Sequence, residues 1–440
     1  MNTDPREIIR STPMSAAQWI AVVLMIALNA LDGFDVLSSA FAAPGIAKEW
    51  GIARDALGVV LAMELVGMGV GSILLGGAAD RFGRRPTMLG CLVVMAGGMA
   101  LATTAQNPQI LGLWRFITGL GIGGMLAAIN AVTAELSSAK GRSLAMSLMV
   151  IGYPLGATIG GTIAALLLTS GDWRVVFEFG AIATVVFIPL IWFFVPETPA
   201  YLLARRPEGA LARINASMAK LRLPGIDALP PVDVRDGAGG RGASVLDILK
   251  PGLIGTTMVL TIGYSLHAIT FYYILKWSPK IVADFGFAAP QAASVLVWAN
   301  IGGATGGALF GFLMHRFGIK RPTIVMLLLG AAAVVVFGLG GSDTTLVGWR
   351  FAVFCTGFAT NAAIVGFYSA FAHGFPAHVR ATGTGFAIGA GRIGSAGSPI
   401  LAGTLFTAGG LSLFTVSAIM ACGSVMAAAL MLMLALREAD

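Results

Sequence analysis

The chain has 440 residues, of which 57% are hydrophobic and only 11% are charged, and its mean hydropathy is +0.85. In soluble globular domains about 25% of residues are charged, so this composition excludes that class and indicates a membrane protein. The net charge of +7 does not predict nucleic-acid binding, because the basic residues are spread over short loops without a tract.

Twelve apolar runs alternate with polar segments, and a helix needs roughly 20 mostly apolar residues to cross the hydrocarbon layer. The expected spans lie near 17–41, 56–79, 87–105, 109–134, 143–168, 174–196, 252–275, 288–313, 322–340, 346–374, 381–407 and 410–436. The first run is too long for the core of a signal peptide, so we expect it to remain as a helix. The sequence therefore predicts an all-α integral membrane protein.

The longest polar stretch divides these spans into two groups of six. It is rich in proline, glycine and charge, contains one predicted amphipathic helix near 208–223, and shows no sign of a catalytic domain. The expected organisation is a cytoplasmic N-terminus, an N-terminal bundle, a cytoplasmic linker, a C-terminal bundle and a cytoplasmic C-terminus. These parts cover 1–16, 17–196, 197–251, 252–436 and 437–440.

The basic residues indicate the orientation in the membrane. With the N-terminus inside, 20 of the 28 lysines and arginines fall in inner segments, and five fall in outer loops, among them Lys276 and Lys280. The other three, Arg115, Arg350 and Arg392, lie within predicted helices. Because cytoplasmic loops carry the excess of basic residues, both termini are expected to be cytoplasmic, in a multi-pass protein of the cell inner membrane.

Two parts of the chain repeat each other at an offset of 235 residues. Trp-Arg-Phe at 114–116 returns at 349–351, and Arg-Phe-Gly at 81–83 returns at 316–318. Long internal repeats in an apolar chain are typical of transporters built from two similar halves, with the substrate site near the membrane midplane between them.

Several classes of function are not expected. Cys91, Cys355 and Cys422 lie in separate predicted spans without metal-ligand spacing, so we interpret them as packing residues. The sequence has no P-loop, which excludes an ATP-driven pump. We expect no metal, no cofactor and no enzymatic chemistry, and we expect a monomer in the lipid bilayer.

The loop at 76–86 resembles the G-x-x-x-D-R-x-G-R-R loop between helices two and three of the major facilitator superfamily. This resemblance implies twelve helices in two pseudo-symmetric six-helix bundles and transport by alternating access. It also implies that the loop acts as a conformational latch, which would involve Asp80, Arg81, Arg84 and Arg85. A role of these arginines in fixing the topology is compatible with that function.

Three further segments resemble one family within that superfamily, the aromatic acid:proton symporters. Leu-Asp-Gly-Phe-Asp at 31–35 is similar to its D-G-x-D signature, and 196–202 to its P-E-[ST]-P-x-[YF]-L segment, which sugar porters share. The segment at 380–399 is similar to its helix-eleven pattern. The resemblance implies proton-driven import of a small aromatic carboxylate, such as a hydroxybenzoate.

Two departures from the family patterns leave other functions open. His315 stands where the second-half loop would repeat the acidic residue. The segment at 152–161 nearly fits an antiporter motif, but Ala157 replaces its proline, which disfavours drug export. The alternatives are a proton symporter of another organic anion or of a sugar, a drug:proton antiporter, and a non-transporting membrane sensor.

Charged residues inside predicted helices are candidate functional residues, because a charge at the bilayer centre costs at least about 2.5–3.5 kcal/mol. Asp32 and Asp35 are three residues apart and share one helix face, so they compete for a proton and are our proton-coupling candidates. Arg115 is expected at nearly the same depth as Asp32 and is predicted to pair with one of the two acids. Such a pair could also serve only structural specificity.

Arg392 is the candidate anchor for the substrate, since its planar guanidinium matches a carboxylate bidentately. Pairing with the acids of the first half is the alternative. Glu64 is a candidate second protonation site, or else a residue of a helix interface near Gly67 and Gly71.

The offset of 235 places His267 opposite Asp32. His267 is a candidate for proton relay or substrate binding, or is a histidine bonded only to its neighbours. Phe34, Tyr272 and Tyr368 are candidate ring contacts, because a site for an aromatic ligand needs mostly apolar walls.

Overall fold

The computed structural model describes residues 4–231, 245–376, 379–408 and 410–434, and within them the chain forms helices joined by loops. Twelve helices in this part of the chain have at least 19 residues, which confirms the predicted number. They are α2 (Ala16–Trp50), α3 (Arg54–Gly76), α5 (Arg84–Ala102), α6 (Pro108–Leu136), α7 (Arg142–Leu167), α8 (Arg174–Phe194), α13 (Ile254–Asp284), α14 (Ala289–Phe317), α15 (Lys320–Gly338), α16 (Leu346–Gly374), α17 (Arg380–Ala408) and α18 (Leu413–Met433).

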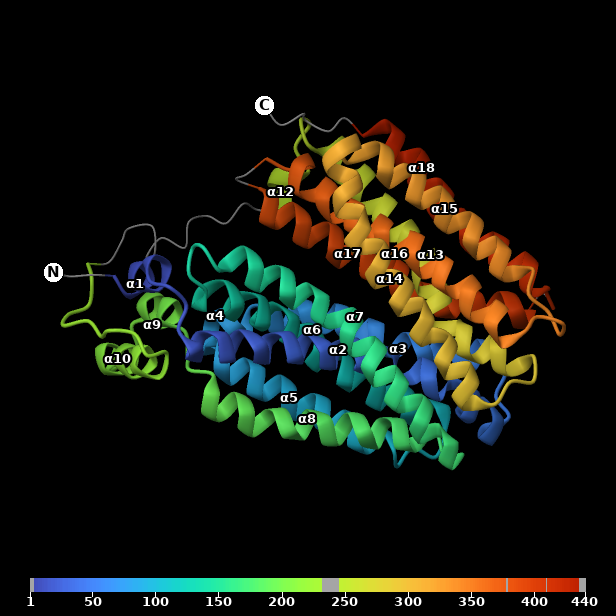
Figure 1. The fold of residues 1–440 in the computed structure, drawn as a ribbon, viewed down its shortest axis with the longest axis horizontal. Coiled ribbons are helices and arrows are strands. Elements are labelled where there is room, and N and C mark those ends of the chain that lie inside the picture. Colours follow the sequence, from blue (N-terminus) through green and yellow to red (C-terminus); the bar gives the residue numbers. More distant parts are fainter. Residues whose placement is uncertain (1–3, 232–244, 377–378, 409, 435–440) are drawn as a thin grey trace.

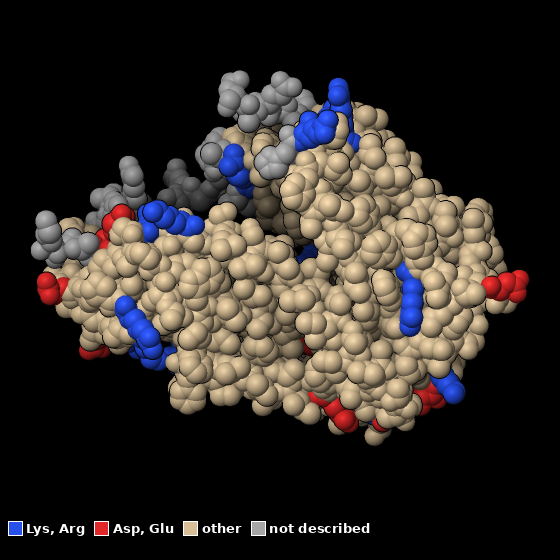
Figure 2. All heavy atoms as spheres, viewed as in Figure 1, with Lys and Arg blue, Asp and Glu red and all other residues tan. Residues whose placement is uncertain are grey.

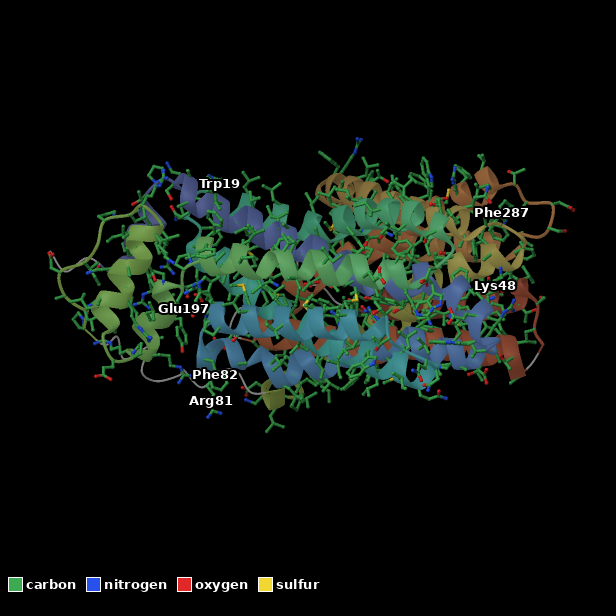
Figure 3. All side chains as sticks on the ribbon, turned by 90° about the horizontal axis from the view of Figure 1, so that it is seen from below. Trp19, Lys48, Arg81, Phe82, Glu197 and Phe287 are labelled. Atoms are coloured by element: carbon green, nitrogen blue, oxygen red, sulfur yellow. The ribbon has the colours of Figure 1, made fainter. Side chains whose placement is uncertain are left out.

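The twelve helices form two bundles, α2 to α8 in an N half and α13 to α18 in a C half (Figure 1). Short helices lie at one end of the molecule, which we call the linker end. They are α1 (Pro5–Ser11), α4 (Ala78–Phe82), α9 (Pro199–Arg205), α10 (Ala210–Lys220) and α12 (Val245–Ile248). Figure 3 shows Arg81 and Glu197 at this end and Lys48 and Phe287 at the opposite one, the far end.

Local sequence explains where the helices begin. Ser15 caps α2 with its hydroxyl while Gln18 caps the Ser15 amide in return, which satisfies two otherwise unpaired amides. The Ser15 hydroxyl also donates to the carbonyl of Leu221, 2.6 Å away, which ties α2 to the end of α10. The predicted amphipathic helix near 208–223 is therefore present and packs at the linker end.

Two helices are longer than predicted. α2 continues to Trp50 and α13 to Asp284, nine residues beyond the predicted ends of both spans. Pro44 and Pro279 lie inside these extensions, and a buried membrane helix tolerates proline when its neighbours satisfy the freed carbonyls. Lys276 and Lys280 consequently belong to α13 and not to an outer loop, which corrects their assignment from sequence.

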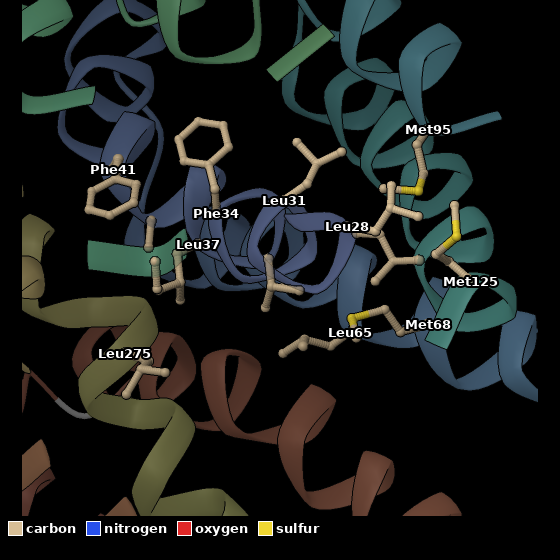
Figure 4. Close-up of a cluster of buried hydrophobic side chains, with 14 of the residues drawn as sticks. Leu28, Leu31, Phe34, Leu37, Phe41, Leu65, Met68, Met95, Met125 and Leu275 are labelled. Carbon is tan, nitrogen blue, oxygen red and sulfur yellow. The ribbon is translucent and has the colours of Figure 1, made fainter. Parts of the chain in front are cut away.

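Small residues let helices of the N half approach closely. A Cβ atom at Gly33 would collide with the backbone carbonyl of Tyr153, and one at Gly156 with that of Ala30, so α2 and α7 lie backbone against backbone. Elsewhere the N half is filled by buried leucine, phenylalanine and methionine side chains, including Leu28, Met68 and Met125 (Figure 4). Methionine fills irregular gaps well because it is unbranched.

The two halves meet along α3 and α17, but only over part of their length. From the far end inward, Gly403 lies against the carbonyl of Arg54 and Gly58 against that of Pro399. Further toward the linker end Gly69 lies near the Cβ of Arg392, and one turn beyond it along α3 the side chain of Ile73 is 81% exposed. The halves therefore part at the level of Arg392, and Figure 2 shows the surface hollowed between them, with a basic side chain inside the hollow.

Candidate functional site

Arg115 forms its ion pair with Glu64 and not with the aspartates. Its Nη2 lies 2.6 Å from Oε1 of Glu64, and both side chains have no exposed surface. The same nitrogen donates to the backbone carbonyl of Asp35 at 2.8 Å. The prediction that Arg115 pairs with Asp32 or Asp35 is therefore wrong. Residue spacing predicts only its depth in the membrane, whereas the packing of α6 on α3 turns it toward Glu64.

Asp32 and Asp35 lie buried in α2, at 2% and 0% exposure. Within the part of the chain that is described, their carboxylate oxygens have no hydrogen-bond partner. Asp35 is the charged group that acts on Asp32, while Arg115 and Glu64 act on Asp35. A buried carboxylate without donors is costly when ionised, so this pair is chemically suited to hold a proton.

Sequence reasoning missed Lys276, which is fully buried in α13. Its Nζ lies 3.5 Å from Oε2 of Glu64 and donates to the backbone carbonyl of Val36. Glu64 is thus held between a cation of its own half and a cation of the other half. The signal in the sequence was a lysine directly after the apolar run predicted to end at residue 275, and it was assigned to an outer loop.

Arg392 lies where the halves part, and it forms no ion pair with any described residue. Four phenol groups interact electrostatically with it, those of Tyr272, Tyr264, Tyr368 and Tyr153. The chain has only six tyrosines, so most of them lie within electrostatic range of this one guanidinium. Tyr153 and Tyr264 were missed in the sequence, where the scarcity of tyrosine was the available signal.

The four tyrosines come from both halves. Tyr153 lies on α7, Tyr264 and Tyr272 on α13, and Tyr368 on α16. The hydroxyls of Tyr264 and Tyr368 are 3.4 Å apart, and the Tyr264 ring also packs edge-on against Phe367 and Phe371. Tyr368 is 43% exposed. The arrangement offers one cation, several hydroxyls and aromatic faces, which can bind a flat anion.

Two predicted ligand contacts are contradicted in this conformation. Both ring nitrogens of His267 are occupied, Nδ1 by the Ser424 hydroxyl at 2.8 Å and Nε2 by the Thr360 carbonyl at 2.9 Å. Phe34 is 3% exposed and packs on Phe179 within the N half. The side chains of both residues pack inside the bundles.

The predicted latch residues form a network at the linker end of the N half. Arg84 pairs with Asp80 and with Glu135, each at 2.9 Å. The Glu197 carboxylate accepts hydrogen bonds from the backbone amides of Arg84 and Arg85, and Arg85 also donates to the carbonyl of Trp192. Burial raises the pKa of Glu197, although these amide donors oppose the shift. Arg81 is exposed and lies over the ring of Phe82.

Replacing Asp80 with asparagine is expected to slow transport without changing the order in which substrates compete. The Asp80 side chain is 72% exposed, so its pair with Arg84 contributes at most about 1 kcal/mol and the variant should fold. Initial uptake rates and competition assays measure both quantities. A changed substrate order would contradict a purely conformational role for Asp80.

Comparison with known proteins agrees with this architecture. The family model described as Major Facilitator Superfamily matches residues 22–399 and 260–440. The gallate transporter of Pseudomonas putida is 29% identical over 413 residues, covering 92% of this chain and 89% of the relative. The 4-hydroxybenzoate transporter PcaK of Acinetobacter baylyi is 28% identical over 393 residues, covering 89% and 86%.

Solved structures show the same fold. The partially occluded, inward open conformation of the xylose transporter XylE from E. coli superposes with a TM-score of 0.71, at 18% identity, over 95% of this chain and 98% of that one. Proteins of this superfamily are transporters and not enzymes. The two six-helix bundles, the loop sequence of 76–86 and the matched family model together show that the chain belongs to the Major Facilitator Superfamily.

Proposed function

We propose that this protein imports a small aromatic carboxylate, similar to a hydroxybenzoate, together with protons, by alternating access. The main observation is Arg392, which forms no ion pair with a described residue, lies where the two halves part and interacts electrostatically with four tyrosines. A fork of N–H donors suits a carboxylate, and phenol groups suit the hydroxyls and the ring of such a substrate. Relatives that carry the names of gallate and 4-hydroxybenzoate transporters support this substrate class.

The proton would be carried by Asp32 and Asp35. Asp35 interacts with the ion pair of Arg115 and Glu64, and Asp32 interacts with Asp35, so a change in the charge of either aspartate acts on that ion pair directly or through its neighbour. In the proposed cycle, the aspartate pair is protonated from outside and the substrate carboxylate binds Arg392. The halves then rock about this site, and both cargoes leave on the linker side.

The proposed location is the cell inner membrane, with the linker end in the cytoplasm. The Arg-rich loop at 81–85 and the basic residues of α9 and α10 lie at that end, as expected for a cytoplasmic face. The halves are closed at the far end in this structure, so the described conformation would face the cytoplasm.

Counterflow exchange in proteoliposomes tests the substrate class. Vesicles loaded with unlabelled 4-hydroxybenzoate should take up labelled 4-hydroxybenzoate and gallate, but neither the matching amide nor labelled xylose. The organic-anion requirement follows from Arg392, since a neutral ligand leaves a buried cation unpaired. Exchange of xylose without exchange of the acids would instead identify a sugar transporter, and empty liposomes correct for passive entry of the acids.

A further inference from the structure

Among the ion pairs between described residues, two join the halves of the protein. Arg54 of α3 and Asp284 of α13 lie 2.8 Å apart at the far end, with side chains 39% and 27% exposed. The second joins Glu64 of α3 to Lys276 of α13, and neither side chain has any exposed surface. An exposed pair contributes little, whereas a buried charge that loses its partner is strongly unfavourable.

The buried pair lies between the candidate substrate site and the far end. Glu64 is ten residues from the first residue of α3 and Lys276 is eight residues from the last residue of α13, both counted from the far end, which at ~1.5 Å per residue is roughly 12–15 Å. Lys276 also donates to the carbonyl of Val36, so it reaches across to two helices of the N half.

We infer that Lys276 is a positioning residue of the transport cycle, whose pair with Glu64 keeps the far entrance closed and must break before that entrance opens. The bundles touch at the far end and part at the linker end, so any conformation open at the far end has to separate α3 from α13. Glu64 keeps Arg115 as its partner after the separation, but Lys276 then loses both of its partners in the N half. The free energy of the conformation that is open at the far end is therefore higher with a charged lysine at position 276 than with an apolar side chain.

This inference predicts a shift in conformation that can be measured without any substrate. Spin labels on a cysteine-free background would report the far end from positions 106 and 342, and the linker end from positions 140 and 321, all of which are exposed. Removing the charge with Lys276→Met should raise the ratio of long to short far-end distances by at least about fivefold. This factor corresponds to the lower end of the coupling free energies usually found between sites in proteins. The linker-end pair should shift toward short distances in the same sample.

Four further variants separate the effect of the ion pair from a general loss of stability. Lys276→Arg keeps the cation and should retain the wild-type distances. Glu64→Gln removes the charge from the other half and should open the far end as Lys276→Met does, while the double variant should add nothing to either single change. Lys280→Met is the matched control, because Lys280 lies one turn away on the same helix and pairs with Asp284 of its own half, and Asp284 keeps its cross-half partner Arg54 when Lys280 is replaced.

Unchanged far-end distances in both Lys276→Met and Glu64→Gln would overturn the inference, and so would equal opening in Lys280→Met. If Lys276→Met does not fold, Glu64→Gln alone decides, since it tests the same contact from α3. The result is independent of which molecule is transported. Unchanged spin-label distances would not contradict the proposed function. A negative uptake assay would not contradict the role of the contact between Lys276 and Glu64.

Discussion

Replacing Arg392 with alanine is expected to weaken binding of an aromatic acid by roughly ten- to a hundredfold. The change removes a charge-assisted contact worth about 1.5–3 kcal/mol. A neutral amide of the same ring should lose little affinity, because it has no negative charge and forms no ion pair with the guanidinium. Arg392→Lys should recover only part of the loss, since a point charge cannot reproduce a bidentate fork. Titration calorimetry on purified protein with one acid and its amide measures both effects.

A matched control for this experiment is Arg350→Ala. Arg350 is the repeat partner of Arg115 in the C half, and its guanidinium contacts the Ser294 hydroxyl at 2.8 Å. The Arg350→Ala variant therefore removes an arginine from the C half, which also contains Arg392, without changing the site around Arg392. Equal losses for acid and amide in Arg392→Ala would remove Arg392 from the substrate site.

Asp32→Asn and Asp35→Asn are each expected to abolish accumulation driven by a pH gradient. Asparagine has nearly the same shape but cannot take up and release a proton, so the coupling is lost while the fold is kept. Neither carboxylate accepts a hydrogen bond from a described residue, so removing the charge leaves no donor there unpaired. Uptake into proteoliposomes with an acidic exterior measures the coupling, and thermal denaturation in detergent verifies folding.

Asp172→Asn provides the control for these substitutions. Asp172 lies in the loop before α8, exposed at the far end, where it is 3.6 Å from Arg174. This variant should accumulate substrate like the wild type. If Asp32→Asn and Asp35→Asn both accumulate substrate at the wild-type level, the proton site lies elsewhere, and Glu64 becomes the next carboxylate to test.

The sequence predicted the helices well because hydrophobic length is a direct requirement of the bilayer. Ten of the expected spans end close to the observed ones, and the two that do not, α2 and α13, were predicted to end nine residues too early. That error had a functional consequence. Lys276 was assigned to an outer loop, so the cross-half contact of Glu64 could not be predicted.

The candidate site was predicted in depth but only partly in direction. Rise per residue places Asp32 and Arg115 at one level, yet it does not say toward which neighbour a side chain turns. The packing of α3, α6 and α13 decides that, and it brings Arg115 and Lys276 to Glu64. Arg392 was identified because a lone cation in the middle of a span has few structural uses, and its position at the end of the seam between the halves agrees with that expectation.

The most direct test of this account is accumulation of labelled 4-hydroxybenzoate in proteoliposomes under an imposed pH gradient, acidic outside. Proton-coupled import predicts accumulation beyond that of empty liposomes, which take up the weak acid passively, and its loss when a protonophore collapses the gradient. It also predicts that Arg392→Ala and Asp32→Asn vesicles resemble the empty ones. Uptake by wild-type vesicles that equals the passive level, in a protein that still unfolds cooperatively on heating, would contradict the proposed function.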